Sequence, residues 1–268
     1  MMKLRLITCA MAMTVIAATV GTNAHAGAIT WMTGVSIDDA GAFVDTTGTL
    51  VAALNADTAG DNAVIGGVTF AGTDQAGWNA GVTGVGGVTV TSNATEGNFG
   101  TTFTQGSTAP GILDADITNL IGSAIWEAQT VTLGGLTIGD TYIVQIITND
   151  SRNGRTTNNK AVLSDGVNTA AASLTAGTAG LVEHSNTVPG AGNPALPGDA
   201  TTGTFIADGL TQTIEIGGTT NGTTLNSGGR AQINGFQLRT IPAAIPEPSS
   251  AVVGLFGLAC LAIKRRKS

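Results

Sequence analysis

Between residues 27 and 241 the hydrophobic residues come in short runs, rich in Val, Ile and Thr, which Gly pairs and Asn or Asp residues interrupt. Such runs are typical of strands on a pleated surface, and the interruptions are typical of turns. The pattern therefore predicts strands at 28–32, 35–37, 64–65, 68–71, 82–91, 99–104, 130–133, 141–148, 160–164, 169–174, 204–207, 210–216 and 231–241.

The clearest strand signal covers residues 141–148. Alternate residues of a strand point to opposite faces of its sheet. Here both sets are mostly apolar: Tyr142, Val144 and Ile146 on one face, and Ile143, Gln145 and Ile147 on the other. A strand of this kind is covered on both sides, so we expect it in the middle of a sheet.

Two Asp-Gly pairs lie between predicted strands and predict tight hairpins. Asp208-Gly209 joins 204–207 to 210–216, with Ile214 and Ile216 expected to face the core and Thr213 and Glu215 the solvent. Asp165-Gly166 joins 160–164 to 169–174. The Gly- and Pro-rich stretch 177–203 predicts a long surface loop.

Two stretches have apolar residues at helical spacing. One is 48–56, with Leu50, Val51 and Leu54, for which Thr47 is a candidate cap. The other is 114–121, with Ile117, Leu120 and Ile121. Many short strands with so little helix predict an all-β fold, an antiparallel β-sandwich of jelly-roll type with one or two short helices. The stretch 27–241 has the length of a single large β domain, so we expect one domain there.

The first 26 residues have the three parts of a secretory signal peptide. Lys3 and Arg5 are the charged start, an apolar stretch follows at 6–20, and Ala24 and Ala26 form a small-x-small site for cleavage after residue 26. An uncleaved N-terminal anchor is the alternative. The segment is short for a membrane span, and the cleavage site favours removal.

The last 23 residues form a second targeting segment. Pro246, Glu247 and Pro248 close a linker at 242–248, and an uncharged apolar run at 251–263 precedes the basic cluster Lys264, Arg265, Arg266 and Lys267. Thirteen helical residues span about 20 Å, less than a bilayer core of about 30 Å. By the positive-inside rule the basic cluster stays in the cytoplasm. Residues 249–268 therefore predict a short, transient transmembrane helix with a basic stop.

This tail resembles the PEP-CTERM sorting signal, in which a Pro-Glu-Pro tripeptide, a short membrane segment and a basic end follow one another at the C-terminus. The match comprises Pro246 to Pro248, the segment at 255–263, and Lys264 to Lys267. The resemblance implies recognition by an exosortase in the inner membrane, cleavage near the tripeptide, and delivery to the cell surface or the extracellular polysaccharide matrix. An ordinary short membrane helix after a Pro-rich linker is the alternative. Short motifs of the body are similar to those of exported β-sandwich proteins with this signal: 48–51, 67–70, 136–142, 149–152, 225–226 and 236–239.

Charge and cysteine content narrow the possible partners of the body. Setting aside the basic residues of the two ends and Glu247 leaves 17 acidic and 5 basic residues, a net charge of about −12. Such a surface repels nucleic acid and anionic lipid, whereas neutral sugars and cations remain compatible with it. Cys9 and Cys260 both lie in the segments expected to be removed, so the mature body has no disulfide or thiol site.

Candidate chemistry in the body is sparse. His184 has no partner at metal or catalytic spacing and is expected to be an exposed loop residue. A glycosidase needs two carboxylates, for which the candidates are Asp38, Asp39, Asp114, Asp116 and Glu127. A structural calcium site is the other use of oxygen ligands in turns, with Asp38, Asp39 and Asp45 or Asp57, Asp61 and Asn62 as its ligands. No other cofactor is expected.

Sugar binding favours exposed aromatic rings beside hydrogen-bonding groups. Trp31 and Tyr142 lie in strands and are expected in the core, whereas Trp78, between Gly77 and Asn79, is the best candidate for a glycan contact. The sequence thus favours an exported, non-enzymatic surface or matrix protein with a structural or carbohydrate-binding role. A glycan-cleaving enzyme on the same scaffold is the alternative, and a matrix filler without a specific ligand is a third possibility.

Overall fold

A computed structural model describes residues 27–38, 40–57, 60–94, 96–99, 114–126, 129–149, 160–164, 181–183, 198–219 and 232–243. Within these ranges the elements are β1 (Thr30–Trp31), β2 (Val35–Ser36), β3 (Thr49–Ala56), β4 (Ala63–Ile65), β5 (Val68–Thr73), α1 (Gln75–Ala80), β6 (Val82–Thr83), the 3-10 turn η1 (Val85–Gly87), β7 (Thr89–Ser92), β8 (Glu96–Phe99), α2 (Ala115–Gly122), β9 (Ala124–Trp126), β10 (Gln129–Gly134), β11 (Thr141–Thr148), β12 (Lys160–Ser164), β13 (Leu181–Glu183), β14 (Asp199–Ile206), β15 (Thr211–Thr219), β16 (Gln232–Ile233) and β17 (Gly235–Ile241). The predicted targeting segments 1–26 and 244–268 lie outside the described residues, as do His184, Asp39 and Glu127.

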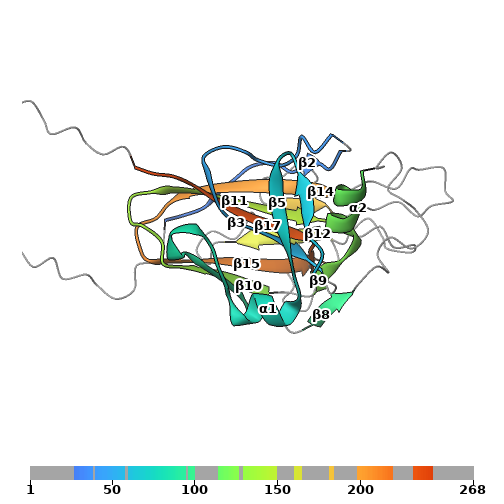
Figure 1. The fold of residues 1–268 in the computed structure, drawn as a ribbon. Helices are drawn as coiled ribbons and strands as arrows, with labels where there is room; N and C mark the ends of the chain where they lie inside the picture. The colour runs from blue at the N-terminus through green and yellow to red at the C-terminus, as the bar shows by residue number, and fades with distance from the viewer. Residues whose placement is uncertain are drawn as a thin grey trace, which may run out of the picture.

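The described strands form two large sheets that pack face to face (Figure 1). The first sheet has the order β1-β14-β11-β17-β3-β5-β4, with β2 beside β1 on the edge of β14, and the second has the order β13-β12-β15-β10-β7-β6. A small third sheet joins β16, β9 and β8. The all-β, sandwich-like prediction is therefore confirmed for the described part of the chain. One pairing departs from the antiparallel rule, since β3 and β5 run parallel.

The main core lies between the two sheets. The first sheet contributes Leu54, Val144 and Phe236 to it, and the second contributes Leu133 and Ile214, all of them almost completely buried. Because apolar side chains from both sheets interdigitate here, burial of their surface is the main term that holds the layers together.

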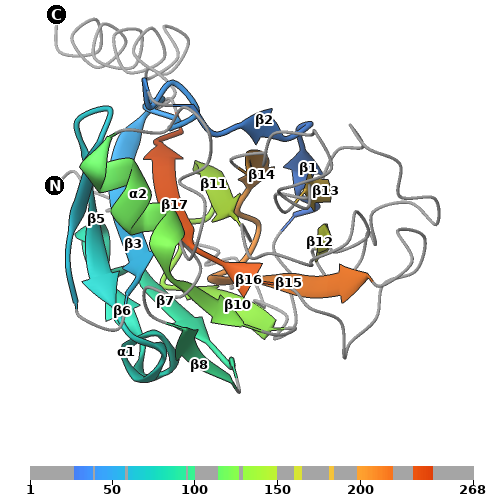
Figure 2. The same cartoon turned by 90° about the vertical axis from the view of Figure 1, so that its right-hand side faces the viewer.

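A second apolar cluster covers part of the outer face of the first sheet. It packs Ile117 and Leu120 of α2, together with Phe43, against Ala53 of β3 and Ile147 of β11. Figure 2 shows α2 on this side of the first sheet. Strand β11 therefore has buried residues on both faces and lies between β14 and β17, which confirms the predicted central strand.

The helix predicted at 114–121 is confirmed as α2. It begins after Asp114, whose side chain accepts hydrogen bonds from the backbone N–H groups of Asp116 and Ile117 at 2.9 Å each. The helix predicted at 48–56 is wrong, because this stretch forms β3. Both faces of β3 are buried, with Leu54 in the main core and Ala53 in the outer cluster, so its apolar residues do not alternate with polar ones and match a helical spacing by coincidence.

The predicted hairpin at Asp208-Gly209 is also wrong. Strand β14 pairs with β11 in the first sheet, and β15 pairs with β10 in the second, so the Asp-Gly turn leads the chain from one sheet to the other. Within β15 the predicted faces are confirmed: Ile214 and Ile216 are buried, whereas Glu215 is exposed.

Other boundaries also differ from the prediction. The stretch expected to be a strand at 82–91 is divided into β6, η1 and β7. Strand β14 starts at Asp199, inside the stretch 177–203 that was expected to be a loop, and β13 lies there too. The single strand expected at 231–241 is divided at Asn234 into β16 and β17, which belong to different sheets. The second predicted hairpin strand, 169–174, lies outside the described residues, and the described partners of β12 are β13 and β15.

Two crossings between the sheets lie side by side at one end of the sandwich, which we call the corner end. Residues 135–140 connect β10 to β11, and residues 207–210 connect β14 to β15. The crossings are hydrogen bonded to each other: Gly139 N donates to the oxygen of Ala207 at 2.7 Å, and Leu136 N donates to that of Leu210 at 3.1 Å. The β10–β15 and β11–β14 pairs thus form one antiparallel ribbon folded over the core.

At the opposite end of the first sheet, buried Asn234 ties several elements together. Its Nδ2 donates to the carbonyl oxygens of Ile121 and Ser123 at 3.1 and 2.7 Å, and its Oδ1 accepts from the backbone N–H of Asn149 at 2.6 Å. Its own backbone N–H donates to the oxygen of Ile147. One side chain therefore fixes the end of α2 against β11 and the start of β17.

Candidate functional site

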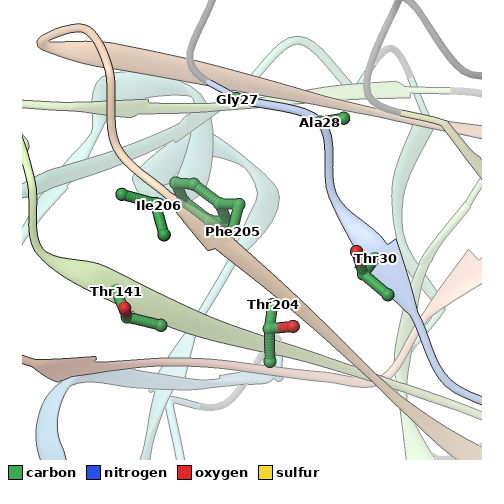
Figure 3. A pocket seen from close by; sticks show the side chains of 7 residues that line it. All are labelled: Gly27, Ala28, Thr30, Thr141, Thr204, Phe205 and Ile206. Atoms are coloured by element: carbon green, nitrogen blue, oxygen red, sulfur yellow. The ribbon is translucent and has the colours of Figure 1, made fainter.

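The described structure has an open groove on the outer face of the first sheet, at the corner end (Figure 3). Its volume is about 460 Å³. The register places Thr30 of β1 opposite Thr204 of β14, and Ile206 of β14 opposite Thr141 of β11. The full lining is Gly27, Ala28, Thr30, Thr141, Thr204, Phe205 and Ile206.

The groove has this composition because β14 alternates strictly at its end. Phe205 turns to the main core, where its ring stacks on Tyr142 with centroids 5.5 Å apart and an interplanar angle of 19°. Thr204 and Ile206 on either side of it therefore point outward. The backbone of Gly27 passes close to the carbonyl oxygen of Ile206, where a Cβ atom would lie only 2.9 Å away, and so closes one rim.

Three threonine hydroxyls and one exposed isoleucine decide what the groove can bind. Ile206 is 61 % exposed, and in the described part of the structure the hydroxyls of Thr30, Thr141 and Thr204 have no hydrogen-bond partner. Each hydroxyl can donate one hydrogen bond and accept two. None of the seven lining residues is a carboxylate, histidine or cysteine, so the groove suits a neutral ligand with hydroxyl groups and an apolar side, and its lining has no acid or base.

Beside the groove, a row of buried polar side chains fastens residues 43–48 to the sheet. Gln145 Nε2 donates to the oxygen of Phe43 at 2.7 Å, and Gln237 Nε2 donates to that of Asp45 at 2.8 Å. The guanidinium of Arg239 donates to the carbonyl oxygens of Thr46, Thr47 and Gly48 at 3.1, 2.7 and 3.0 Å. These contacts give the polar positions of β11 and β17 a structural role.

The candidate calcium ligands that are described have hydrogen-bonding roles in their own turns. Asp38 accepts from Ala42 N at 3.0 Å, and Asp45 accepts from Thr47 N at 2.7 Å, while Asp39 lies outside the described residues. In the second candidate set, Asp57 accepts from Asp61 N, and Asn62 accepts from Gly72 N. Among the described residues no group of three or more His, Cys, Asp or Glu side chains could hold a metal ion.

Of the carboxylates considered for acid and base catalysis, some likewise lie at structural positions in the described part of the chain and others lie outside it. Asp114 is the N-cap of α2, and Asp116 lies in the first turn of that helix. Carboxylates at a helix N-terminus interact favourably with its unpaired N–H groups and with its dipole. Asp114 thus has a structural role in starting α2. The remaining candidates Asp39 and Glu127 lie outside the described residues.

The expected exposure of Trp78 is wrong. Trp78 is only 1 % exposed, and its ring meets that of Phe236 edge to face, with centroids 5.9 Å apart and an interplanar angle of 77°. Residues 75–80 form α1, capped by Asp74, instead of an open turn, and the helix directs the indole into the main core. Tyr142 is buried as expected, and Trp31 packs against the core while remaining partly exposed.

Sequence reasoning missed the groove because its residues are ordinary threonines in three separate strands. Thr30 and Thr204 meet only through the β1–β14 register, and Thr141 joins them only because β11 pairs with β14. The one local sign of the groove was that Thr204 and Ile206 flank the apolar Phe205, because strand neighbours of an inward-facing residue face outward.

No helix among the described residues is long and apolar enough to cross a bilayer. Pro246, Glu247, Pro248, Lys264, Arg265, Arg266, Lys267, Ala24 and Ala26 all lie outside the described residues. Comparison with protein-family models, with curated proteins and with solved structures finds no match for this chain.

Proposed function

We propose that the chain is an exported, surface or extracellular-matrix protein whose β-sandwich body has a non-catalytic role, and that its C-terminal tail is a sorting signal cut by an exosortase. The observation that carries the proposal is the order of three parts in the tail: the tripeptide Pro246 to Pro248, the apolar run 251–263 and the basic cluster Lys264 to Lys267. Export through the signal peptide at 1–26 precedes this step.

The position where the tail leaves the body supports this proposal. Strand β17 ends at Ile241, and Ala243 N donates to Asp140 Oδ1 at 2.7 Å, so the chain is fixed to the body until three residues before Pro246. The core is built by residues up to Leu238 in β17. Removal of the tail after the tripeptide would therefore leave both cores with all their described side chains.

The folded ribbon supports a finer assignment of the fold. A jelly roll is made by folding antiparallel strand pairs across two sheets. The adjacent crossings at 135–140 and 207–210 have this arrangement, so we include a jelly-roll topology in the proposal.

The test of processing is the mass of the mature protein recovered from the cells that make it. We expect a species that lacks residues 1–26 and ends near Pro248. A Glu247→Ala variant should keep its tail and stay in the membrane fraction, whereas the matched variant Glu215→Ala, which changes an exposed carboxylate of β15, should be processed normally. Intact residues 264–268 in the mature wild-type protein would contradict the proposal.

For the body we propose carbohydrate binding in the groove at the corner end. The threonine hydroxyls of its lining and the exposed Ile206 match the hydroxyl rim and the apolar CH surface of a neutral sugar. With no carboxylate in the lining, binding without cleavage is the role that the groove supports. Screening the protein against a glycan array identifies a ligand, and calorimetry measures its affinity.

Replacing Thr204 with Val should then weaken binding about tenfold while leaving stability almost unchanged, since one or two hydrogen bonds of about 1 kcal/mol each are lost. Thr69→Val, at an exposed position of β5 outside the groove, is the control. Equal affinity of the two variants, or no bound glycan at all, would remove carbohydrate binding from the proposal and leave a structural role.

A further inference from the structure

Exposed aliphatic side chains gather at the corner end of the sandwich. Eight large hydrophobic residues are exposed in the described part of the chain, and five of them lie here, between 40 and 65 % exposed. Single exposed hydrophobic residues need no explanation, but a contiguous group marks a contact surface. The group consists of Val85, Ile138, Ile206, Leu210 and Ile241.

Contacts between their strands and turns place these five residues together. Ile206 and Ile241 are the two strand neighbours of Thr141, on either side of it. Ile138 and Leu210 lie on the two crossings that are hydrogen bonded to each other. Val85 belongs to η1, whose Gly87 lies so close to Gly135 of the first crossing that a Cβ atom there would be 2.9 Å from the Gly87 oxygen.

Both ends of the described chain also lie at the corner end (Figure 1). Gly27 lies against Ile206, and Ala243 is hydrogen bonded to Asp140 at the start of β11. From Ala243 the apolar run 251–263 begins eight residues later, and from Gly27 the apolar stretch 6–20 ends seven residues earlier. At about 3.3–3.6 Å per residue, neither segment can lie further than about 30 Å from this end of the body.

We propose that the corner end is a lipid-contacting surface, which rests on the bilayer while the tail is still inserted. This inference rests on the proposed function, since the tail supplies the anchor. A tether of at most about 30 Å keeps one end of the sandwich near the membrane, and that end carries the exposed aliphatic side chains. Aliphatic side chains on a surface partition into the headgroup region, so the contact orients the body with the crossings toward the membrane.

The charge of the corner end and of the body determines which lipid headgroups this surface can contact. The described residues at the corner end include the carboxylates Asp140 and Asp208, whereas the guanidinium of nearby Arg239 is buried and bonded to the carbonyl oxygens of Thr46, Thr47 and Gly48; the body carries a net charge of about −12. Anionic headgroups therefore repel this surface. The partner is a bilayer of zwitterionic lipid, and added anionic lipid weakens the contact.

The experiment uses the full chain reconstituted in phosphatidylcholine vesicles that carry a nitroxide near the headgroup end of the acyl chain. The native Cys260 lies in the apolar run of the tail, so in a Cys9→Ser background a fluorescent label on it reports whether the tail is inserted. Labels at Ile138→Cys or Leu210→Cys, in a background with Cys9→Ser and Cys260→Ser, report the corner end. Val35→Cys is the matched control, because Val35 is 57 % exposed and pairs with Ala200, six residues and about 20 Å along β14 from Ile206.

We expect quenching of the labels at 138 and 210 to be about threefold stronger than that of the label at 35, because a surface side chain in the interface lies about 5–10 Å deep. Replacing a third of the lipid with an anionic one should reduce this difference. Quenching at Cys260 with no difference between the body labels would overturn the lipid contact and leave the sorting proposal intact. Absence of quenching at Cys260 would overturn the sorting proposal itself.

Two other occupants of this surface would be recognised in the same experiment. Self-quenching between corner-end labels that rises with the protein-to-lipid ratio would assign the surface to a second copy of the chain. A blue shift of these labels without any lipid would assign it to the chain's own apolar run. Either result would overturn the lipid contact.

Discussion

Replacing Trp78 with alanine tests whether this indole belongs to the core or to a binding surface. In the structure the ring is almost fully buried, contacts Phe236 edge to face, and is directed inward by α1. We therefore expect Trp78→Ala to lower the free energy of unfolding substantially and to leave glycan binding, where it is found, unchanged in the folded fraction.

The size of the effect follows from burial. An aromatic side chain buries about 150–250 Å², which at about 25 cal/mol per Å² corresponds to about 4–6 kcal/mol as an upper limit. Alanine keeps a small part of this and favours the helix slightly, so the net loss should be about 3–5 kcal/mol. In a domain of this size each kcal/mol lowers Tm by about 2–4 °C, which gives a decrease of about 10 °C.

Urea unfolding followed by far-ultraviolet circular dichroism measures this difference. Trp78→Phe is the matched variant: it keeps a ring beside Phe236 and removes the indole Nε1, which is buried without a hydrogen-bond partner in the described structure. It should cost no more than about half of the alanine change, since most of the apolar contact remains. A loss below about 1 kcal/mol for Trp78→Ala would refute the buried placement, because a removed core aromatic costs about three times as much.

Three further changes test other parts of the fold by the same unfolding measurement. Asn234→Ala removes the partner of the buried Ser123 oxygen and of the Asn149 N–H, and it takes one of two donors from the Ile121 oxygen, so it should cost about 3 kcal/mol. Asn79→Ala, at an exposed position, should cost about 1 kcal/mol or less, and similar losses for the two variants would contradict the central role of Asn234. Asp114→Ala should cost about 1 kcal/mol through loss of the α2 cap, and Asp114→Asn should cost almost nothing, so equal losses would argue against capping. Gly198→Ala should destabilise several times more than Gly86→Ala: both glycines have positive φ, but a Cβ atom at 198 would overlap the carbonyl oxygen of Thr148, whereas at 86 it would meet nothing within 4 Å.

The sequence predicted the elements whose burial leaves a simple pattern. Strand β11 was identified as central because both of its faces are apolar, and α2 was identified because one face of it packs on the first sheet. Strand β3 failed for the same reason that β11 succeeded: with both faces buried, its residues have no period of their own, and Leu50, Val51 and Leu54 then happen to match a helix.

Pairing between distant segments was harder to predict than the elements themselves. Asp208-Gly209 specified a reversal of the chain, but β14 pairs with β11 along its whole length and β15 with β10, so the strands that the turn joins belong to different sheets. The groove depends on these same long-range registers. Its threonines carry no local signal, whereas the local context of Trp78 suggested exposure that the inward direction of α1 prevents.

The place of the two chain ends determines how the body responds to mechanical load. A pull through Ala243 acts along β17, which is hydrogen bonded on both sides, to β11 and to β3, so many bonds share the force and must break together. A pull through Gly27 reaches β1, a two-residue strand that pairs only with β14 among the described strands, where bonds break one after another. Attachment at the C-terminal end would thus give a rigid hold on the sandwich, while traction on the N-terminal end would peel its edge at much lower force.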